Sequence, residues 1–347
     1  MLPSVNDFAV ALSAGPGRNK LTPTLPRACR RLRAGLLSYR EMTALLTSLL
    51  QSTVTMAVPL LLGALGELLA ERAGIINIGL EGMLLTGAFA AMAATYYTAL
   101  PVLGLLAAWI AGLLLALVFA YVVVVHSANQ IVVGTALNLF AVGVTGVMYR
   151  ALFGVTGATL TVTGFAPLPL PFLSSLPVLG PAFCSQTILG YLAFVLVPVV
   201  AFGLYKTIPG LKLRMVGENP AAAAAQGVAV RFTQLLALLG CGVLAATAGA
   251  YLAVAYAHAF VEGMSAGRGF IALAIVIFGR WSAWGVLGAA LLFGLATALQ
   301  FHVQALGLRI PYQFLLMLPY VLTLLVLAGY AGRTKAPAAL GVPLETE

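Results

Sequence analysis

The chain has 347 residues, of which 62% are hydrophobic and 8% are charged, and its mean hydropathy is +1.05. So few charges cannot cover a water-exposed surface, so the composition excludes an ordinary soluble fold. The net charge of +9 comes from basic residues scattered along the chain rather than from one compact patch, which argues against nucleic-acid binding. We therefore expect a protein whose solvent is the lipid bilayer.

Residues 1–41 form a basic tail that differs from the rest of the chain. The tail contains the stretch GPGRNKLTPTLPRACRRLRAG, which is rich in Pro, Gly and Arg and has no apolar core of signal-peptide length. One hypothesis is that translation normally begins at Met42, where MTALLTSLL reads as a natural start, so that the tail is not native. The other is a disordered basic tail.

Apolar runs of membrane-spanning length follow the tail. Because about 20 helical residues cross the roughly 30 Å hydrocarbon layer, we expect an all-α polytopic membrane domain over residues 42–332. It would have about nine spans, one or two of them broken by glycine, and an internal repeat. The expected spans lie at about 45–66, 75–97, 102–125, 131–152, 188–205, 232–257, 284–304 and 312–330, with a short ninth at about 269–279.

Two of these segments are crowded with glycine. The first, ERAGIINIGLEGMLLTGAFAAMAAT, also carries Asn77 and Glu81, and the second reads GRGFIALAIVIFGRWSAWGVLGAALLFG. Interrupted segments in two halves of a chain are typical of transporters with internal repeats, although close helix packing through small residues explains many of the glycines equally well. An ionisable group such as Glu81 near the membrane has a partner or a role; a local cap or a local pairing at the cytoplasmic interface, with Arg72 as one candidate partner, is the simpler interpretation.

The fourth span places polar residues on one face. Thr135, Asn138 and Thr145 are spaced three and seven apart, which puts them roughly on one side of a helix. A buried amide in lipid needs a hydrogen-bond partner, either a neighbouring helix or a passing substrate. Asn77, Glu81, Thr135 and Asn138 are therefore the residues expected to line or gate a path through the membrane.

The loop at 206–231 carries Lys206, Lys212, Arg214 and Arg231, so the positive-inside rule predicts that it is cytoplasmic. The tail at 333–347 then also lies in the cytoplasm, whereas five crossings place residues 1–41 outside. Within the loop, VGENPAAAAAQG predicts a helix of about seven residues, capped by Asn219, with Pro220 in its first turn. Alanine favours such a helix and Gly227 ends it. A helix this short is marginal in water and is stabilised by docking on a partner.

No feature of the chain predicts chemistry of its own. It lacks a G-x-x-x-x-G-K-[ST] loop for ATP, and its only aspartate, Asp7, lies in the basic tail, which excludes the paired aspartates of a magnesium-dependent transferase. Its three cysteines and three histidines have no ligand-like spacing. We therefore expect no catalytic, cofactor-binding or metal-binding residues, and any motor would be another subunit.

Together the motifs resemble the permease subunits of ABC importers in the branched-chain amino acid, simple sugar and nucleoside family. The resemblance covers the chain from Met42 to about Pro343 and is strongest to the nucleoside-type permeases. The motifs on which it rests are ERAGIINIGLEGMLLTGAF, QIVVGTALNLFAVGVTGVMYR, VGENPAAAAAQGVAV, GRGFIALAIVIFGRWSAWGVLGAALLFG and PYQFLLMLPYVLTLLVLAG.

The resemblance implies a bacterial inner-membrane ABC transporter and its partners. A coupling helix would fall on Gly217, Glu218, Asn219, Pro220, Ala221 and Ala224 and meet an ATPase that fuses two nucleotide-binding domains. A second permease would complete the pore, and a lipoprotein or periplasmic binding protein would deliver the substrate. The substrate is expected to be a nucleoside, with a simple sugar or a branched-chain amino acid as the alternatives. An ion-coupled secondary transporter is the remaining class; it would need a buried acidic pair, for which Glu81 alone is thin support.

Overall fold

The structure is a computed structural model that describes residues 27–154, 160–168, 183, 185–305, 313–314, 317, 321, 324 and 336–343. The chain divides into two units, residues 1–46 and 47–347. In the first unit the described residues are helical and belong to the start of α2 (Arg27–Arg72). The expected span at 312–330 lies almost entirely outside the described residues.

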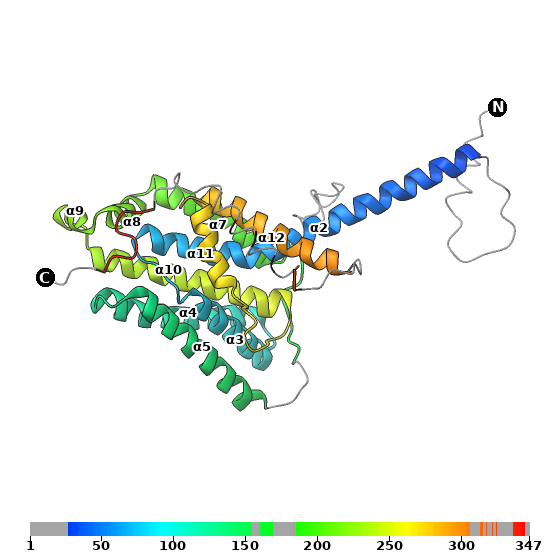
Figure 1. The fold of residues 1–347 in the computed structure, drawn as a ribbon. Helices are drawn as coiled ribbons and strands as arrows, with labels where there is room; N and C mark the ends of the chain where they lie inside the picture. Colours follow the sequence, from blue (N-terminus) through cyan, green and yellow to red (C-terminus); the bar gives the residue numbers. More distant parts are fainter. Residues whose placement is uncertain are drawn as a thin grey trace. The chain divides into compact units, whose positions relative to one another are not determined.

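The second unit is a bundle of helices (Figure 1). Its described part holds isolated β-bridges, such as Thr161 with Ala259, in place of a sheet. After α2 the elements are α3 (Leu80–Thr98), α4 (Pro101–Ala120), the π-helical turn η1 (Tyr121–Val125), α5 (Gln130–Phe153), α7 (Ile188–Lys206), α8 (Ile208–Glu218), α9 (Pro220–Ala225), α10 (Val230–Ala250), the π-helical turn η2 (Tyr251–Tyr256), α11 (Arg268–Phe278) and α12 (Ala283–Ala305).

Within the described residues, 6 helices are long and apolar enough to cross a membrane. They are Met42–Arg72, Pro101–Val125, Gln130–Phe153, Ile188–Lys206, Val230–Tyr256 and Ala283–Ala305. α11 is apolar but shorter. The all-α expectation is confirmed for these residues, whereas the count of about nine spans and the internal repeat stay predictions.

Two predicted helix ends are displaced. The first span was expected to stop at about residue 66, but α2 continues to Arg72 and so includes Glu67 and Glu71. The second was expected to begin at about residue 75, but α3 begins at Leu80, after a non-helical segment at 73–79. Gly74 has a φ of 88° there, a left-handed conformation that favours glycine and interrupts the helix.

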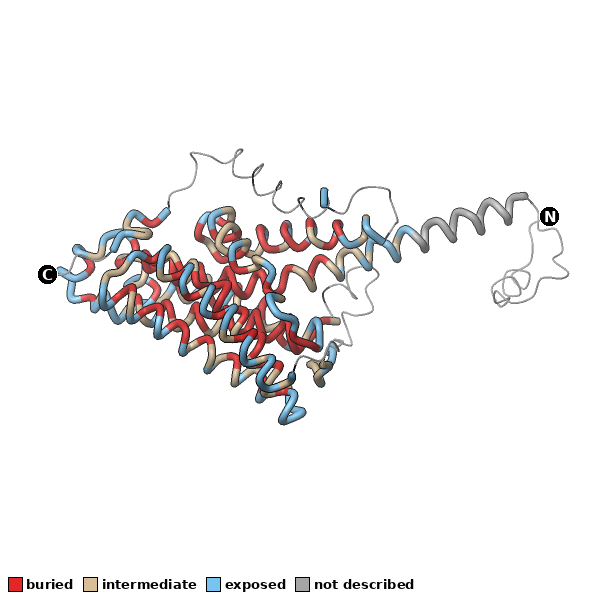
Figure 2. Tube along the Cα trace, turned by 60° about the horizontal axis from the view of Figure 1, so that its bottom comes forward, coloured by how far each residue is buried: buried red, intermediate tan, exposed pale blue. Residues whose placement is uncertain are grey.

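α3, α4 and α10 pack against one another in the second unit. Their contacts depend on small residues: a Cβ atom on Gly87 of α3 would lie 2.5 Å from the Cα of Ala246 in α10, and one on Gly112 of α4 would contact Gly242 of α10. Backbones approach this closely in membrane bundles because small side chains allow it. Buried residues accordingly gather on the inner faces of the packed helices, while much of α5 is exposed (Figure 2).

Replacing Gly249 of α10 by alanine is expected to destabilise the bundle. The new methyl group would clash with the carbonyl oxygen of Leu84 and lie 2.6 Å from the amide nitrogen of Ala88, both in α3. Overpacking of this kind costs about 1–3 kcal/mol, so the melting temperature of the purified protein in detergent should fall. Gly143 of α5 is the control, because a Cβ atom there meets nothing within 4 Å. Equal melting temperatures for the two alanine variants would show that the α3–α10 contact is not this tight.

Candidate functional site

The interrupted segment at 73–79 has free backbone groups that side chains of other helices bind. The Oε1 atom of Gln130, the first residue of α5, accepts the N–H of Ile76 at 2.8 Å. Gln234 of α10 donates from Nε2 to the carbonyl oxygen of Ala73 at 3.3 Å. Both glutamines are buried. A buried backbone break is stable only when such groups are paired, so the segment is held by its neighbours rather than by a helix of its own.

Asn138 binds both sides of the same break. Its Nδ2 atom donates to the carbonyl oxygen of Ile78 at 2.9 Å, and its Oδ1 atom accepts the N–H of Gly82 at 2.8 Å. Thr135 lies nearby in α5, but it is exposed and its hydroxyl donates to carbonyl oxygens of its own helix. The sequence analysis named both residues; the structure brings only Asn138 to the interrupted segment.

Asn77 lies fully buried in the segment, against a carboxylate and two sulfur atoms. Its N–H donates to Oε1 of Glu67 at 2.8 Å, and its Nδ2 atom donates to Sγ of Cys241 at 3.3 Å and to Sδ of Met83 at 3.4 Å. The Sγ atom of Cys241 is 3.6 Å from Oε2 of Glu67. The Oδ1 atom of Asn77 is buried and has no hydrogen-bond partner among the described residues.

Glu71 lies one helical turn after Glu67 and is also buried. Its Oε2 atom accepts the indole N–H of Trp281, in the loop between α11 and α12. Arg72 binds the same loop from its Nε atom, which donates to the carbonyl oxygen of Trp281 at 2.9 Å. The last turn of α2 is therefore fixed to the α11–α12 loop.

These two glutamates correct the sequence analysis, which found only Glu81 as an acidic group in the membrane region. Glu67 and Glu71 are a buried acidic pair that the analysis missed because it ended the first span at residue 66. The signal was present in GELLAER, where the spacing of four puts both carboxylates on one face of a helix that is otherwise apolar. Among the described residues, no group of three or more His, Cys, Asp or Glu side chains is placed to hold a metal ion.

Glu81 joins the two glycine-rich segments. Its Oε1 atom accepts the N–H of Gly267 at 2.8 Å and its Oε2 atom accepts the N–H of Gly269 at 2.6 Å, so the carboxylate caps the amino end of α11. A negative charge is stabilised there by the free N–H groups and the helix dipole. A Cβ atom on Gly269 would lie 2.6 Å from the backbone of Glu81, so this position must be small. A local pairing of Glu81 with Arg72 is wrong, because Arg72 binds Trp281. Glu81 does form a cap, but on α11 rather than on a neighbouring turn.

The short helix predicted from the alanine run is confirmed as α9. The Oδ1 atom of Asn219 accepts the N–H of Ala222 at 3.0 Å, Pro220 begins the helix, and Gly227 has a φ of 76° just beyond its end. Ala223 is buried against Val216 and Val228. The other alanines of α9 are exposed. The helix thus presents a surface of small apolar side chains at one end of the bundle (Figure 1).

Gly217 and Glu218, the two residues before the capping Asn219, differ in their exposure to solvent. Glu218 is exposed, and its Oε2 atom lies 3.4 Å from the N–H of Ala338. Gly217 is buried, and a Cβ atom on it would clash with the carbonyl oxygen of Arg72. Both were predicted to belong to the surface that meets the ATPase, but only Glu218 is accessible from outside. Nor did that analysis predict α8, which precedes α9.

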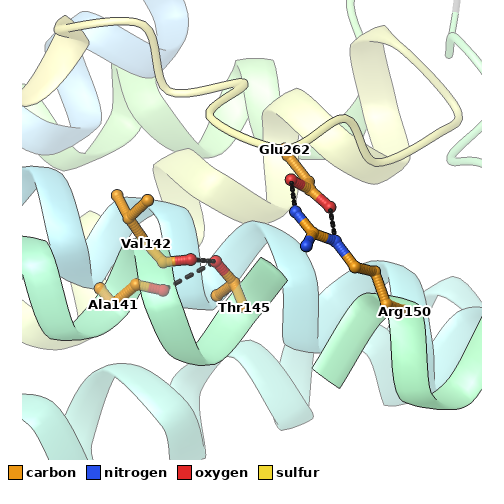
Figure 3. A network of polar contacts seen from close by, with 5 residues as sticks. All are labelled: Ala141, Val142, Thr145, Arg150 and Glu262. Atoms are coloured by element: carbon orange, nitrogen blue, oxygen red, sulfur yellow. Dashed lines mark hydrogen bonds and ion pairs between the residues drawn. The ribbon is translucent and has the colours of Figure 1, made fainter. Parts of the chain in front are cut away.

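Arg150, near the end of α5, forms an ion pair with Glu262 in the loop before α11 (Figure 3). The guanidinium binds both carboxylate oxygens, at 3.0 and 2.8 Å. This hydrogen bonding and the positive charge hold the pKa of Glu262 below its ordinary value. The pair is therefore ionised at neutral pH, and it is lost only as the pH falls through that lowered pKa.

In the same helix, the hydroxyl of buried Thr145 donates to the carbonyl oxygens of Ala141 and Val142.

Residues 49–327 match the model of a family described as branched-chain amino acid transport system / permease component. The chain belongs to this family. The resemblance inferred from the motifs is thereby confirmed. Together with its apolar helices, membership makes the chain a multi-pass membrane permease.

Relatives of known name that match this permease over most of its length include the following three. The guanosine ABC transporter permease protein NupQ of Bacillus subtilis is 37% identical, over 87% of this chain and 98% of the relative. The nucleoside ABC transporter permease protein NupC of Lactococcus lactis is 39% identical, over 82% and 92%. The putative glucose ABC transporter permease protein TsgC13 of Haloferax volcanii is 40% identical, over 76% and 79%. No solved structure matches the permease.

Replacing Glu81 of the permease by glutamine is expected to lower its stability. A glutamine has one acceptor oxygen, so its NH2 group would face an N–H donor of Gly267 or Gly269. A buried donor left unpaired costs about 1–3 kcal/mol, and the melting temperature in detergent should fall accordingly. Glu262→Gln, at an exposed ion pair, is the control and should melt like the unmodified protein. If Glu81→Gln also melts unchanged, the carboxylate does not cap α11.

Proposed function

We propose that this permease is the membrane-spanning subunit of an ATP-driven importer for nucleosides in the cytoplasmic membrane. The observation that carries the substrate class is the near full-length similarity to relatives named for guanosine and nucleoside transport, 37% and 39% identical. Uncharged polar groups such as Asn77 and Thr135 suit ribose hydroxyls and the edges of a base. The chain itself is no enzyme, and ATP is hydrolysed on a partner.

The proposed partners are an ATPase with two fused nucleotide-binding domains, a second permease and a substrate-binding lipoprotein or periplasmic protein. The exposed alanines of α9 support the first, because small side chains let a groove on another protein approach closely. Glu218 and the basic residues of the 206–231 loop would fix the orientation of the ATPase. The exposed apolar side chains of α5, among them Leu139 and Phe140, support contact with lipid or with the second permease.

The proposed arrangement in the membrane follows from the 206–231 loop, which is cytoplasmic together with residues 333–347. Residues 1–41 form a basic tail and residues 42–332 the permease domain, with about nine spans. An internal repeat is supported by two similar helices: α4 and α10 each pass into a π-helical turn at a tyrosine, Tyr121 and Tyr251. Helix interruptions of this kind are frequent at functional sites.

Transport would proceed by alternating access. Closure of the ATPase would displace α9, and the two halves of the bundle would then rock around a central path. Asn77, Glu81, Thr135 and Asn138 are the proposed lining or gating residues. Asn77 is the best supported, because its Oδ1 atom is buried without a partner and would accept a hydroxyl hydrogen once the segment opens. Glu81 and Asn138 would act by holding the interrupted segment and α11 in place.

A simple sugar is the second candidate substrate. The relative supporting it is the putative glucose permease, which is 40% identical over 76% of this chain. A branched-chain amino acid has only the family description in its favour. Ion-coupled transport finds some support in the buried pair Glu67 and Glu71, although both carboxylates already accept hydrogen bonds from neighbouring groups.

Uptake into proteoliposomes that contain the whole importer tests the substrate. We expect ATP-dependent accumulation of labelled guanosine, and none of ribose, glucose or leucine at the same concentration. Uptake of a sugar without guanosine would assign the permease to the second candidate. Uptake driven by an ion gradient without the ATPase would contradict the proposal.

Substitutions of Asn219 test the coupling role of α9. Asn219→Ala removes the cap from a helix of six residues, at a cost of about 1 kcal/mol, and should reduce ATP-dependent uptake without changing the amount of permease in the membrane. Asn219→Ser is the matched variant, because a serine hydroxyl also caps a helix and should preserve uptake. Equal uptake by the alanine and serine variants would argue against a docked α9.

A further inference from the structure

Residues 337–342 form a turn after the last described helical residues. The N–H of Leu340 donates to the carbonyl oxygen of Pro337 at 3.1 Å, and that of Val342 to the carbonyl oxygen of Ala339 at 3.2 Å. Gly341 has a φ of 76°, a conformation that favours glycine. Pro337 is buried, and Leu340 packs against the main hydrophobic core. The 337–342 turn is therefore a folded part of the bundle.

The turn is bound to two other segments through backbone groups. The N–H of Ala339 donates to the carbonyl oxygen of Gly217 at 2.9 Å, and the N–H of Gly341 donates to the carbonyl oxygen of Gly74 at 3.0 Å. Gly217 lies at the end of α8 and Gly74 lies in the interrupted segment. One turn thus ties the base of α9 to the break between α2 and α3.

These segments also contact each other directly. Gly217 has no room for a Cβ atom, because one would clash with the carbonyl oxygen of Arg72 and lie 3.3 Å from the amide nitrogen of Gly74. A Cβ atom on Gly74 would in turn lie 3.3 Å from the carbonyl oxygen of Ala339. Three segments that are distant in sequence are therefore in direct backbone-to-backbone contact.

The contact among Gly217, Gly74 and Ala339, here called the junction, lies between α9 and Asn77. Gly217 is two residues before Asn219, the cap of α9, and Gly74 is three residues before Asn77. α9 has few other contacts, since of its alanines only Ala223 is buried. A movement of α9 therefore displaces mainly the residues that flank it in the chain. On its amino-terminal side these residues include Gly217, which belongs to the junction.

We propose that the 337–342 turn is a positioning element that transmits movement of α9 to the interrupted segment at 73–79. The proposal rests on the proposed function of α9 as the site where an ATPase docks. Without the turn, the ATPase would still dock and hydrolyse ATP, but the interrupted segment would follow α9 less closely. The result is fewer nucleoside molecules imported per ATP hydrolysed.

The test compares variants of the turn in the reconstituted importer. Ala339→Pro removes the N–H group that binds Gly217. A permease that ends at Ala336 lacks both this N–H group and that of Gly341, which binds Gly74. Ala336→Pro is the control, because Ala336 is exposed and its N–H makes no hydrogen bond within the described residues. The measurements are assembly with the ATPase, the rate of ATP hydrolysis, and guanosine taken up per ATP.

We expect both variants to assemble and to hydrolyse ATP, while uptake per ATP falls about fivefold in the truncated permease and less in Ala339→Pro, a size typical for residues that link two sites. An unchanged ratio would overturn the proposal. So would failure of both variants to assemble while the control assembles, because the turn would then serve stability alone. If the unmodified importer itself shows no ATP-dependent guanosine uptake, the proposed function fails instead.

Discussion

The structure depends on how a broken helix is stabilised inside an apolar bundle. Between α2 and α3 the backbone at 73–79 is not helical, and its polar groups are bound by side chains from other helices. In lipid each of these groups would cost several kcal/mol if left unpaired. Gln130, Asn138, Glu67 and Gln234 are therefore obligatory partners, and the position of the segment follows the helices that carry them.

The same partners connect the segment to the rest of the bundle. Glu67 and Glu71 hold the end of α2 to Asn77 and Trp281, and Glu81 holds the start of α3 to the amino end of α11. Close glycine contacts between α3 and α10 leave little room for independent movement. A displacement of the segment would therefore also displace α5, α10 and α11.

Local features were predictable from the sequence, whereas long-range contacts were not. α9 was predicted correctly because its cap, its proline and its alanines act within a few residues. Glu81 was recognised as informative, but its partners Gly267 and Gly269 lie far along the chain, so the sequence indicated only a local cap or a local pairing, for example with Arg72. Glu67 and Glu71 were missed because charged residues were taken to end the span. Only tertiary contacts, such as that of Trp281 with Glu71, show why they are tolerated there.

The central claim is that movement of α9 reaches the interrupted segment. Amide hydrogen exchange of the assembled importer, with and without a non-hydrolysable ATP analogue, tests it most directly. Exchange reports the opening of backbone hydrogen bonds, among them those of Ile76, Asn77 and Gly82. The account predicts that nucleotide changes exchange at 219–225 and at 73–82 together. A change confined to 219–225, with residues 73–82 unaffected, would contradict it.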